Sequence, residues 1–192
     1  MKSISKYLML FCTSVALLLS SCSSNDDAPD ELEIGDFHKG GVIFYLDSTK
    51  DHGLVCAVLD QSAAAEWGCF GNIVNTDANG DVAIGTGSQN TLNIESACNT
   101  VGTAADLASN LTLNSYSDWF LPSKDELNQL YINNTLINET ALDNGGTALE
   151  SSDYWSSTQD GSLNAWNQNL TNGNQGTGNK DQILYVRSVR SF

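Results

Sequence analysis

The chain of 192 residues carries 23 acidic side chains and eight lysines and arginines, which gives a net charge of −15 at pH 7. A surface of this sign repels phosphate backbones. Because affinity for nucleic acids rests largely on neutralising phosphates, nucleic acid is excluded as a partner, and sulfated polysaccharides are disfavoured for the same reason. The length suits one domain with a core of its own.

The first residues have the layout of a secretory signal. Two lysines precede an apolar run, residues 7–19, which is shorter than the roughly 20 residues that a membrane-spanning helix needs. Leu-Ser-Ser-Cys at residues 19–22 matches the bacterial lipobox, in which the cysteine is lipidated and becomes the new N-terminus. The sequence therefore predicts a lipoprotein signal peptide over residues 1–21 and lipidation at Cys22, with an ordinary cleaved signal as the alternative.

Residues 22–36 are acidic and contain little that could be buried, so they predict a flexible tether before a domain over residues 37–192. A cysteine that carries several acyl chains would hold the protein stably on a membrane. Ser23 after the lipobox resembles lipoproteins sorted to the outer membrane, and the acidic residues after it resemble surface-export signals. We therefore expect a protein that is lipid-anchored in the outer membrane through Cys22 and exposed on the cell surface.

The expected elements of the domain change in type along the chain. Helices in the middle and strands at both ends predict an α+β fold with short antiparallel sheets, two to three short helices and adjacent terminal strands. The ranges are 40–47 and 52–60 for the first strands, 62–68 for a helical turn, 71–90 for a long loop, 90–98 and 103–111 for helices, and, after a third helix and another polar loop, 153–158, 165–170 and 183–192 for the last strands.

The stretch SDWFLPSKDEL, residues 117–127, predicts a corner between a strand and the third helix. Pro122 disfavours helical geometry at the residue before it. Ser123 and Glu126 fit the capping box S-x-x-E, in which each side chain bonds the backbone N–H of the other residue. Trp119 and Trp155, which lie in short apolar runs, are expected in the core.

Three cysteines follow Cys22, and an exported protein sits where disulfides persist. Cys56 lies in an apolar run and is expected to be a buried free thiol. Cys69 and Cys98 both lie near Gly- and Asn-rich segments. They are therefore the expected disulfide pair.

Patterns for catalysis and metal binding are sparse. His52 and Cys56 would share a strand face about 13 Å apart, which is too far for a base and its nucleophile. No zinc motif occurs in the sequence. The stretch DANGD, residues 77–81, resembles the start of a calcium loop, but its glycine is misplaced and Ser88 stands where a glutamate belongs, so a plain turn is favoured. We expect no cofactor, no metal and no enzymatic activity.

Four motifs, in the order DWFLPSKDELNQLY, YWSST, AWNQNL and YVRSVR, resemble the collagen-like adhesin C-terminal (Lcl_C) domain family. The resemblance covers residues 37–192 and implies a C-type-lectin-like fold, with Trp119 and Leu121 in the core. The best-known member is an adhesin for sulfated glycosaminoglycans, but this chain lacks a basic patch. The calcium-dependent lectin signature also fails, because WNQ at residues 166–168 stands where W-N-D would supply an aspartate.

The expected ligand site lies in the polar stretch from Gln159 to Asp181, which is expected to be a loop. Amide side chains suit sugar hydroxyls because they both donate and accept hydrogen bonds, an indole offers a stacking face, and loops often carry binding residues. A plain connector is the alternative, since Asn and Gly also make turns. The candidate residues are Asp160, Asn164, Trp166, Asn167 and Asn169.

Together these features predict a surface-anchored lipoprotein with a non-catalytic adhesion domain, whose ligand is a glycan or a protein of the envelope or host. Two alternatives stay open. One is a carboxylate-dependent enzyme, or enzyme accessory, that acts on polysaccharides. The other is a purely structural envelope protein.

Overall fold

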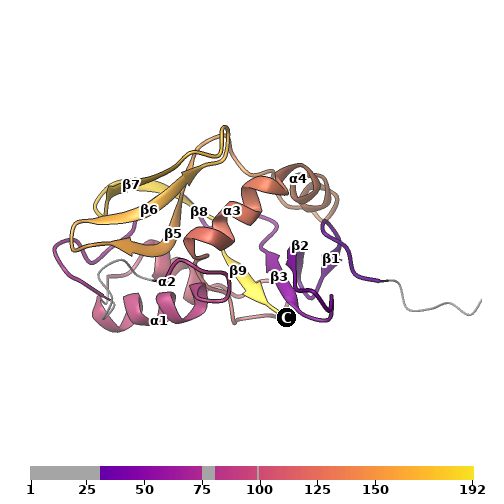
Figure 1. Cartoon of the computed structure of the whole chain (residues 1–192), viewed down its shortest axis with the longest axis horizontal. Helices are drawn as coiled ribbons and strands as arrows, with labels where there is room; N and C mark the ends of the chain where they lie inside the picture. Colours follow the sequence, from indigo (N-terminus) through magenta and orange to yellow (C-terminus); the bar gives the residue numbers. More distant parts are fainter. Residues whose placement is uncertain (1–30, 75–80, 99) are drawn as a thin grey trace, which may run out of the picture. The chain divides into compact units, whose positions relative to one another are not determined.

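The computed structural model describes residues 31–74, 81–98 and 100–192, which form two sheets and four helices (Figure 1). The expected α+β class is confirmed, but the sheets are not all antiparallel as expected, because β5 pairs parallel with β8. One sheet has the strand order β1-β2-β3-β9 and the other β4-β8-β5-β6-β7. The strands are β1 Phe37–His38, β2 Gly41–Leu46, β3 Gly53–Cys56, β4 Ser62–Glu66, β5 Asp153–Asp160, β6 Asn164–Asn169, β7 Gln175–Asn179, β8 Ile183–Val186 and β9 Val189–Ser191. The helices are α1 Gly87–Ala97, α2 Ala104–Ser109, α3 Lys124–Ile132 and α4 Asn134–Asp143.

The strands near the two ends of the domain lie side by side, as the sequence predicts. β9 pairs antiparallel with β3 and places Arg190 opposite Val55. The single strand expected over residues 183–192 is two strands, because β8 ends at Val186 in one sheet and β9 begins at Val189 in the other. The chain therefore crosses between the sheets at Arg187.

Helix α3 connects the two sheets. It packs against β2 on one side and against β5 and β6 on the other, and Figure 1 shows it between them. α1 packs on β5, α2 on β4 and β8, and α4 on β2. None of the helices in the described part of the chain is long and apolar enough to span a membrane.

Helix α4 is the helix that the sequence analysis misses, so the expected number of two to three helices is too low. Only Ile137 and Ala141 of this helix are fully buried. The segment is rich in Asn and Thr, and its apolar residues Leu136 and Leu142 are exposed, so the periodic signal is too weak to separate a helix from a polar loop.

The corner at residues 117–127 is confirmed. Trp119 is 3% exposed and Leu121 is fully buried. Ser123 Oγ accepts the N–H of Glu126 at 3.3 Å, and the Glu126 carboxylate accepts the N–H of Ser123 at 2.7 Å, so both halves of the capping box are present. Glu126 also accepts the N–H of Gly85 at 2.8 Å, which joins the segment before α1 to α3. The role of the corner is therefore structural: it packs in the core and caps helix α3.

Residues 62–66 form strand β4, so the helical turn expected there is wrong. Alanine favours helices in isolation, but Ala65 pairs with β8, and its carbonyl accepts the indole N–H of Trp155 at 2.9 Å. Trp67 is fully buried directly after the strand and donates to the carbonyl of Ser156 at 2.7 Å. These tertiary contacts override the local propensity.

The expected disulfide is confirmed. Cys69 and Cys98 are bridged with their Cα atoms 5.5 Å apart, and Cys56 is free and fully buried. In the chain-entropy treatment, a crosslink across this separation of 29 residues stabilises the fold by about 3–4 kcal/mol. Burial raises the pKa of the Cys56 thiol to about 11, so it stays protonated at neutral pH.

Residues 31–36, which the sequence analysis assigns to the tether, belong to the same compact unit as the domain expected over residues 37–192. Leu32 and Ile34 pack against the buried cluster that contains Ile43 and Trp119, and the N–H of Gly35 donates to the carbonyl of Ile43 at 2.8 Å. The end of the expected tether is therefore part of the domain. Cys22 and the rest of residues 1–30 lie outside the described residues.

Candidate functional site

The stretch expected to be a loop, from Gln159 to Asp181, is largely sheet. β6 and β7 pair antiparallel, with Trp166 opposite Thr177. The sequence analysis misses β7 because QGTGN has no apolar residue and two glycines, which weaken strands. A Cβ at Gly178 would lie 2.7 Å from Gln182 Oε1, 3.0 Å from Asn167 Nδ2 and 3.2 Å from the Trp155 ring, so a larger residue there would have to displace these side chains.

The five candidate residues do not gather on one surface. Asp160 and Asn164 face each other across the β5–β6 turn, and Trp166 follows Asn164 on the same face of β6. Asn167 and Asn169 point to the opposite face, because side chains alternate along a strand. The structure therefore divides the predicted site between the two faces of one sheet.

Trp166 is not an open stacking platform. Its ring is half-buried, and the ammonium of Lys124, at the start of α3, lies 3.5 Å from the ring centroid. Gln175 of β7 donates to the carbonyl of Lys124 at 3.1 Å and so ties the helix to the sheet on this side. A ligand that stacked on this face of the indole would have to displace the Lys124 ammonium. Nothing in the sequence indicates this contact, because the two residues are far apart in the chain.

Asn169 serves the turn between β6 and β7. Its amide nitrogen donates to Asp153 at 3.0 Å, and its amide oxygen accepts the N–H groups of Thr171 at 3.0 Å and Asn172 at 3.3 Å. Those bonds are typical of an Asn-built turn, which favours the connector interpretation for this residue. The side chains of the other three polar candidates make no hydrogen bond to any other described residue; they are Asp160, Asn164 and Asn167.

The motif YVRSVR supplies an arginine with a structural role. Arg187 is fully buried; its Nε donates to Asp60 at 2.7 Å and its Nη1 to the carbonyl of Ala57 at 2.7 Å. The hydroxyl of Tyr154 donates to the second carboxylate oxygen of Asp60 at 3.0 Å. Burial raises the pKa of Asp60, and the Arg187 guanidinium opposes that rise. The network fixes the crossing between the two sheets.

Arg190, the second arginine of the motif, has the same kind of role. Its Nε donates to Asp118 of the corner, and its guanidinium lies 3.9 Å from the ring centroid of Tyr116. Its Nη1 donates to the carbonyl of Lys39 at 3.2 Å. The motif therefore contributes to the architecture and leaves few cations on the surface.

Lys180 is fully buried and forms no ion pair with any described residue. Its ammonium donates to the carbonyl of Asn72 at 2.8 Å and lies 4.5 Å from the ring centroid of Trp67. Burial alone lowers its pKa from 10.5 to about 8. The side chain holds the segment after β4 against the sheet at the cost of a buried charge.

We expect Lys180→Met to stabilise the protein at pH 7, with the gain shrinking as the pH rises from about 8 to 10.5. Between these pH values, Lys180 is more protonated in the unfolded state than in the folded state, so the wild-type protein becomes more stable as the pH rises. The variant has no lysine at this position and lacks this pH-dependent gain in stability. Urea unfolding of both proteins at pH 7, 9 and 10.5 measures the difference. A difference in unfolding free energy between the two proteins that stays constant from pH 7 to 10.5 would contradict a lysine whose pKa is lowered by burial.

The other residues considered for chemistry are not brought together. His52 is mostly exposed and its Nδ1 lies 3.7 Å from Asp47, whereas Cys56 is buried in a separate apolar cluster. No group of three or more His, Cys, Asp or Glu that could hold a metal occurs within residues 31–74, 81–98 and 100–192. Residues 77–80 of the calcium-like stretch lie outside these ranges.

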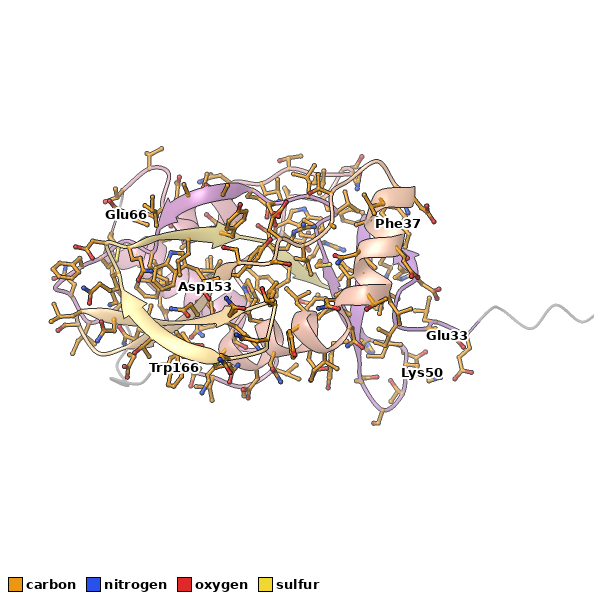
Figure 2. The ribbon with its side chains drawn as sticks, turned by 90° about the horizontal axis from the view of Figure 1, so that it is seen from above. Glu33, Phe37, Lys50, Glu66, Asp153 and Trp166 are labelled. Atoms are coloured by element: carbon orange, nitrogen blue, oxygen red, sulfur yellow. A yellow bond between two sulfur atoms is a disulfide. The ribbon has the colours of Figure 1, made fainter. Side chains whose placement is uncertain are left out.

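A second candidate surface, which the sequence analysis does not find, is a groove at the end of the domain where the described chain begins. It is lined by residues from three separate segments: 32–34, 44–50 and 129–133. Figure 2 shows Glu33 and Lys50 together at this end, away from Trp166. No sequence signal could identify the groove, because its three segments are far apart in the chain and meet only in the folded domain.

The structure is that of an α+β domain of two sheets joined by a central helix, in which Arg187 and Arg190 serve packing. The chain belongs to the Lcl C-terminal domain family, Lcl_C, whose sequence model matches residues 57–190. The motifs named above lie within or overlap this range and mostly serve the fold.

A solved structure has a similar fold. It is a fimbrial protein from Bacteroides ovatus ATCC 8483, with a TM-score of 0.59 and 14% sequence identity. The comparison covers 78% of this chain and 43% of the fimbrial protein, so this chain spans less than half of that protein's length. No curated protein matches the sequence.

Proposed function

We propose that this protein is a surface adhesion lipoprotein whose folded domain binds an extracellular glycan, or a protein of the envelope or host, without transforming it. Membership of the Lcl_C family over residues 57–190 carries the proposal. The fimbrial protein with the similar fold supports it, because fimbriae are surface structures. An enzyme that acts on polysaccharides is the less favoured alternative, since the candidate residues of the sheet surface offer no paired acid and base.

A kinship with C-type lectins belongs to the same proposal. The ordered motifs of the sequence support it, and so does the pairing of strands from the two ends of the domain. Fold kinship does not transfer a ligand. The ligand has to be argued from the surface of this chain.

The adhesion role is tested by probing arrays of glycans and of envelope and host proteins with the full-length chain. Selective, saturable binding is the expected result. If no ligand in either array binds, the adhesion role is wrong and a structural envelope role takes its place. Breakdown of an arrayed polysaccharide would instead favour the enzyme.

Membrane anchoring rests on Cys22, which we expect to be acylated. In cells, Cys22→Ala should leave an unacylated precursor and move the protein from the outer-membrane fraction to the soluble fraction, because a lipid on this residue is the proposed anchor. Radiolabelled fatty acid and cell fractionation measure both effects, and Cys12→Ala, inside the expected signal, is the matched control. Unchanged labelling and fractionation of the Cys22 variant would contradict the anchor.

A further inference from the structure

The groove at the start of the described chain has the size of a small-ligand site. Its volume is about 490 Å³, and pockets for small molecules range over about 300–1,000 Å³. Residues 44–46 of β2 line it beside residues 32–34, and Gln129 of α3 and Asn133 add two amides. The site therefore combines aromatic and aliphatic surface with hydrogen-bonding groups.

The amides of the groove have unused hydrogen-bonding capacity. Gln129 makes no side-chain hydrogen bond to any other described residue. Asn133 uses its Nδ2 to donate to the carbonyl of Phe44 at 3.0 Å and to that of Gln129 at 3.2 Å, while its Oδ1 has no partner within the described chain. Tyr45 is half-buried and contributes aromatic surface between these groups and the rim. Such groups match ring hydroxyls and the apolar face of a sugar.

The charges around the groove disfavour an anionic ligand. Lys50 is already paired with Glu31 at 2.8 Å, and that contact raises the pKa of its ammonium. Glu33 and Asp47 add two further carboxylates to the lining. The hydroxyl of Thr49 donates to Asp47 at 2.7 Å and lowers its pKa, so Asp47 is ionised and accepts hydrogen bonds. An uncharged ligand with hydroxyl donors suits this balance.

The backbone around the groove disfavours an extended peptide. β2 is an inner strand, paired with β1 and β3. On its outer side Ile43 exchanges hydrogen bonds with Gly35 and Asp36 at 2.8 Å each, and the carbonyl of Phe44 is taken by Asn133. A peptide that adds a strand needs free backbone groups along an edge. This strand offers few at the groove.

From this balance of side chains, charge and backbone we propose that the groove between residues 32–34, β2 and Gln129 is a binding site for a neutral oligosaccharide. The inference rests on the proposed adhesion function and deepens it, because it names the ligand class and moves the site from the β5–β7 sheet to the other end of the domain. Ligand hydroxyls donate to Asp47 and to Asn133 Oδ1, and they accept from the Gln129 amide.

The test is an NMR titration of the isotope-labelled full-length chain with maltohexaose, cellohexaose and mannohexaose, and with hexagalacturonate as the acidic comparison. We expect at least one neutral hexaose to shift the side-chain amide signals of Gln129 and Asn133. Gln129→Ala should weaken that hexaose about two- to tenfold, which corresponds to one lost hydrogen bond. Gln89→Ala, which changes an exposed helical glutamine outside the groove, is the matched control and should leave affinity unchanged.

Three results would overturn the groove: binding of no neutral hexaose, binding that shifts only the Asn164 and Asn167 side-chain amides, or equal affinity of wild type and Gln129→Ala. Each is distinct from failure of the adhesion role. If the arrays show selective binding of an acidic glycan or of a protein, the adhesion role stands and the groove is not the site of a neutral oligosaccharide. If nothing binds on either array, the adhesion role itself is wrong.

Discussion

Replacing Arg187 with alanine lowers the free energy of unfolding by about 3–5 kcal/mol, because the change leaves the partly buried carboxylate of Asp60 without its counter-ion. The guanidinium also donates to the carbonyls of Ala57, Thr147 and Ala148, which lose these bonds together. Urea unfolding at pH 7 measures the loss. The loss should shrink as the pH falls into the range where Asp60 takes up a proton, because burial already raises its pKa.

Arg190→Ala is the control for this prediction. Its partner Asp118 is 61% exposed, so solvent replaces the ion pair, and the contact with Tyr116 adds a modest cation–π term. We expect a loss of about 1–2 kcal/mol. Equal losses for the two arginines would show that Arg187 does not anchor the crossing between the sheets.

Trp155→Ala lowers the free energy of unfolding by about 3–5 kcal/mol. The ring is fully buried between the five-stranded sheet and its helices, so truncation leaves a cavity. The carbonyl of Ala65 also loses the indole donor at 2.9 Å. Thermal or urea unfolding, followed by tryptophan fluorescence and circular dichroism, measures the effect.

Trp166→Ala gives the matched comparison, because Trp166 lies in the neighbouring strand but is half-buried and contacts the Lys124 ammonium. We expect this variant to lose about 1–2 kcal/mol. If Trp166→Ala proves as damaging as Trp155→Ala, Trp166 is a core residue and the β6 face has no role in binding.

Local signals in the sequence were sufficient for part of the fold. The capping box at Ser123 and Glu126 needs only a spacing of three residues, and the stripe of Ala104 and Ala108 marks α2 in the same way. The Cys69–Cys98 disulfide followed from elimination once Cys56 was assigned to an apolar strand. Elements that depend on distant partners were missed: β4 requires Trp155, and β7 is held by its ladder with β6.

The candidate site was harder to predict because strand alternation and helix packing decide it. The strand expected over residues 165–170 is β6, and alternation along it sends Trp166 and Asn167 to opposite faces, so one loop site over residues 159–181 that contains both does not form. The pairing of Lys124 with Trp166 depends on where α3 crosses the sheet. The groove around Gln129 combines three segments whose proximity exists only in the folded domain.

The two surfaces differ in how they could serve adhesion. On the sheet around β6, the side chains of Asp160, Asn164 and Asn167 make no hydrogen bond to the described residues, but the indole of Trp166 is covered by Lys124. In the groove, the Gln129 amide and the Asn133 Oδ1 oxygen lie beside Tyr45 and have no hydrogen-bond partner within the described chain. Residues 32–34, which the sequence analysis assigns to the tether, form one wall of the groove.

The most direct measurement incubates the full-length chain with a neutral hexaose, records binding by calorimetry, and then recovers the sugar for mass spectrometry and an assay of new reducing ends. We expect saturable binding, with the hexaose recovered intact after prolonged incubation. Shortened products would contradict a non-catalytic adhesion domain. Absence of binding across the neutral hexaoses would contradict the groove, and absence of binding to any arrayed glycan or protein would contradict adhesion as a whole.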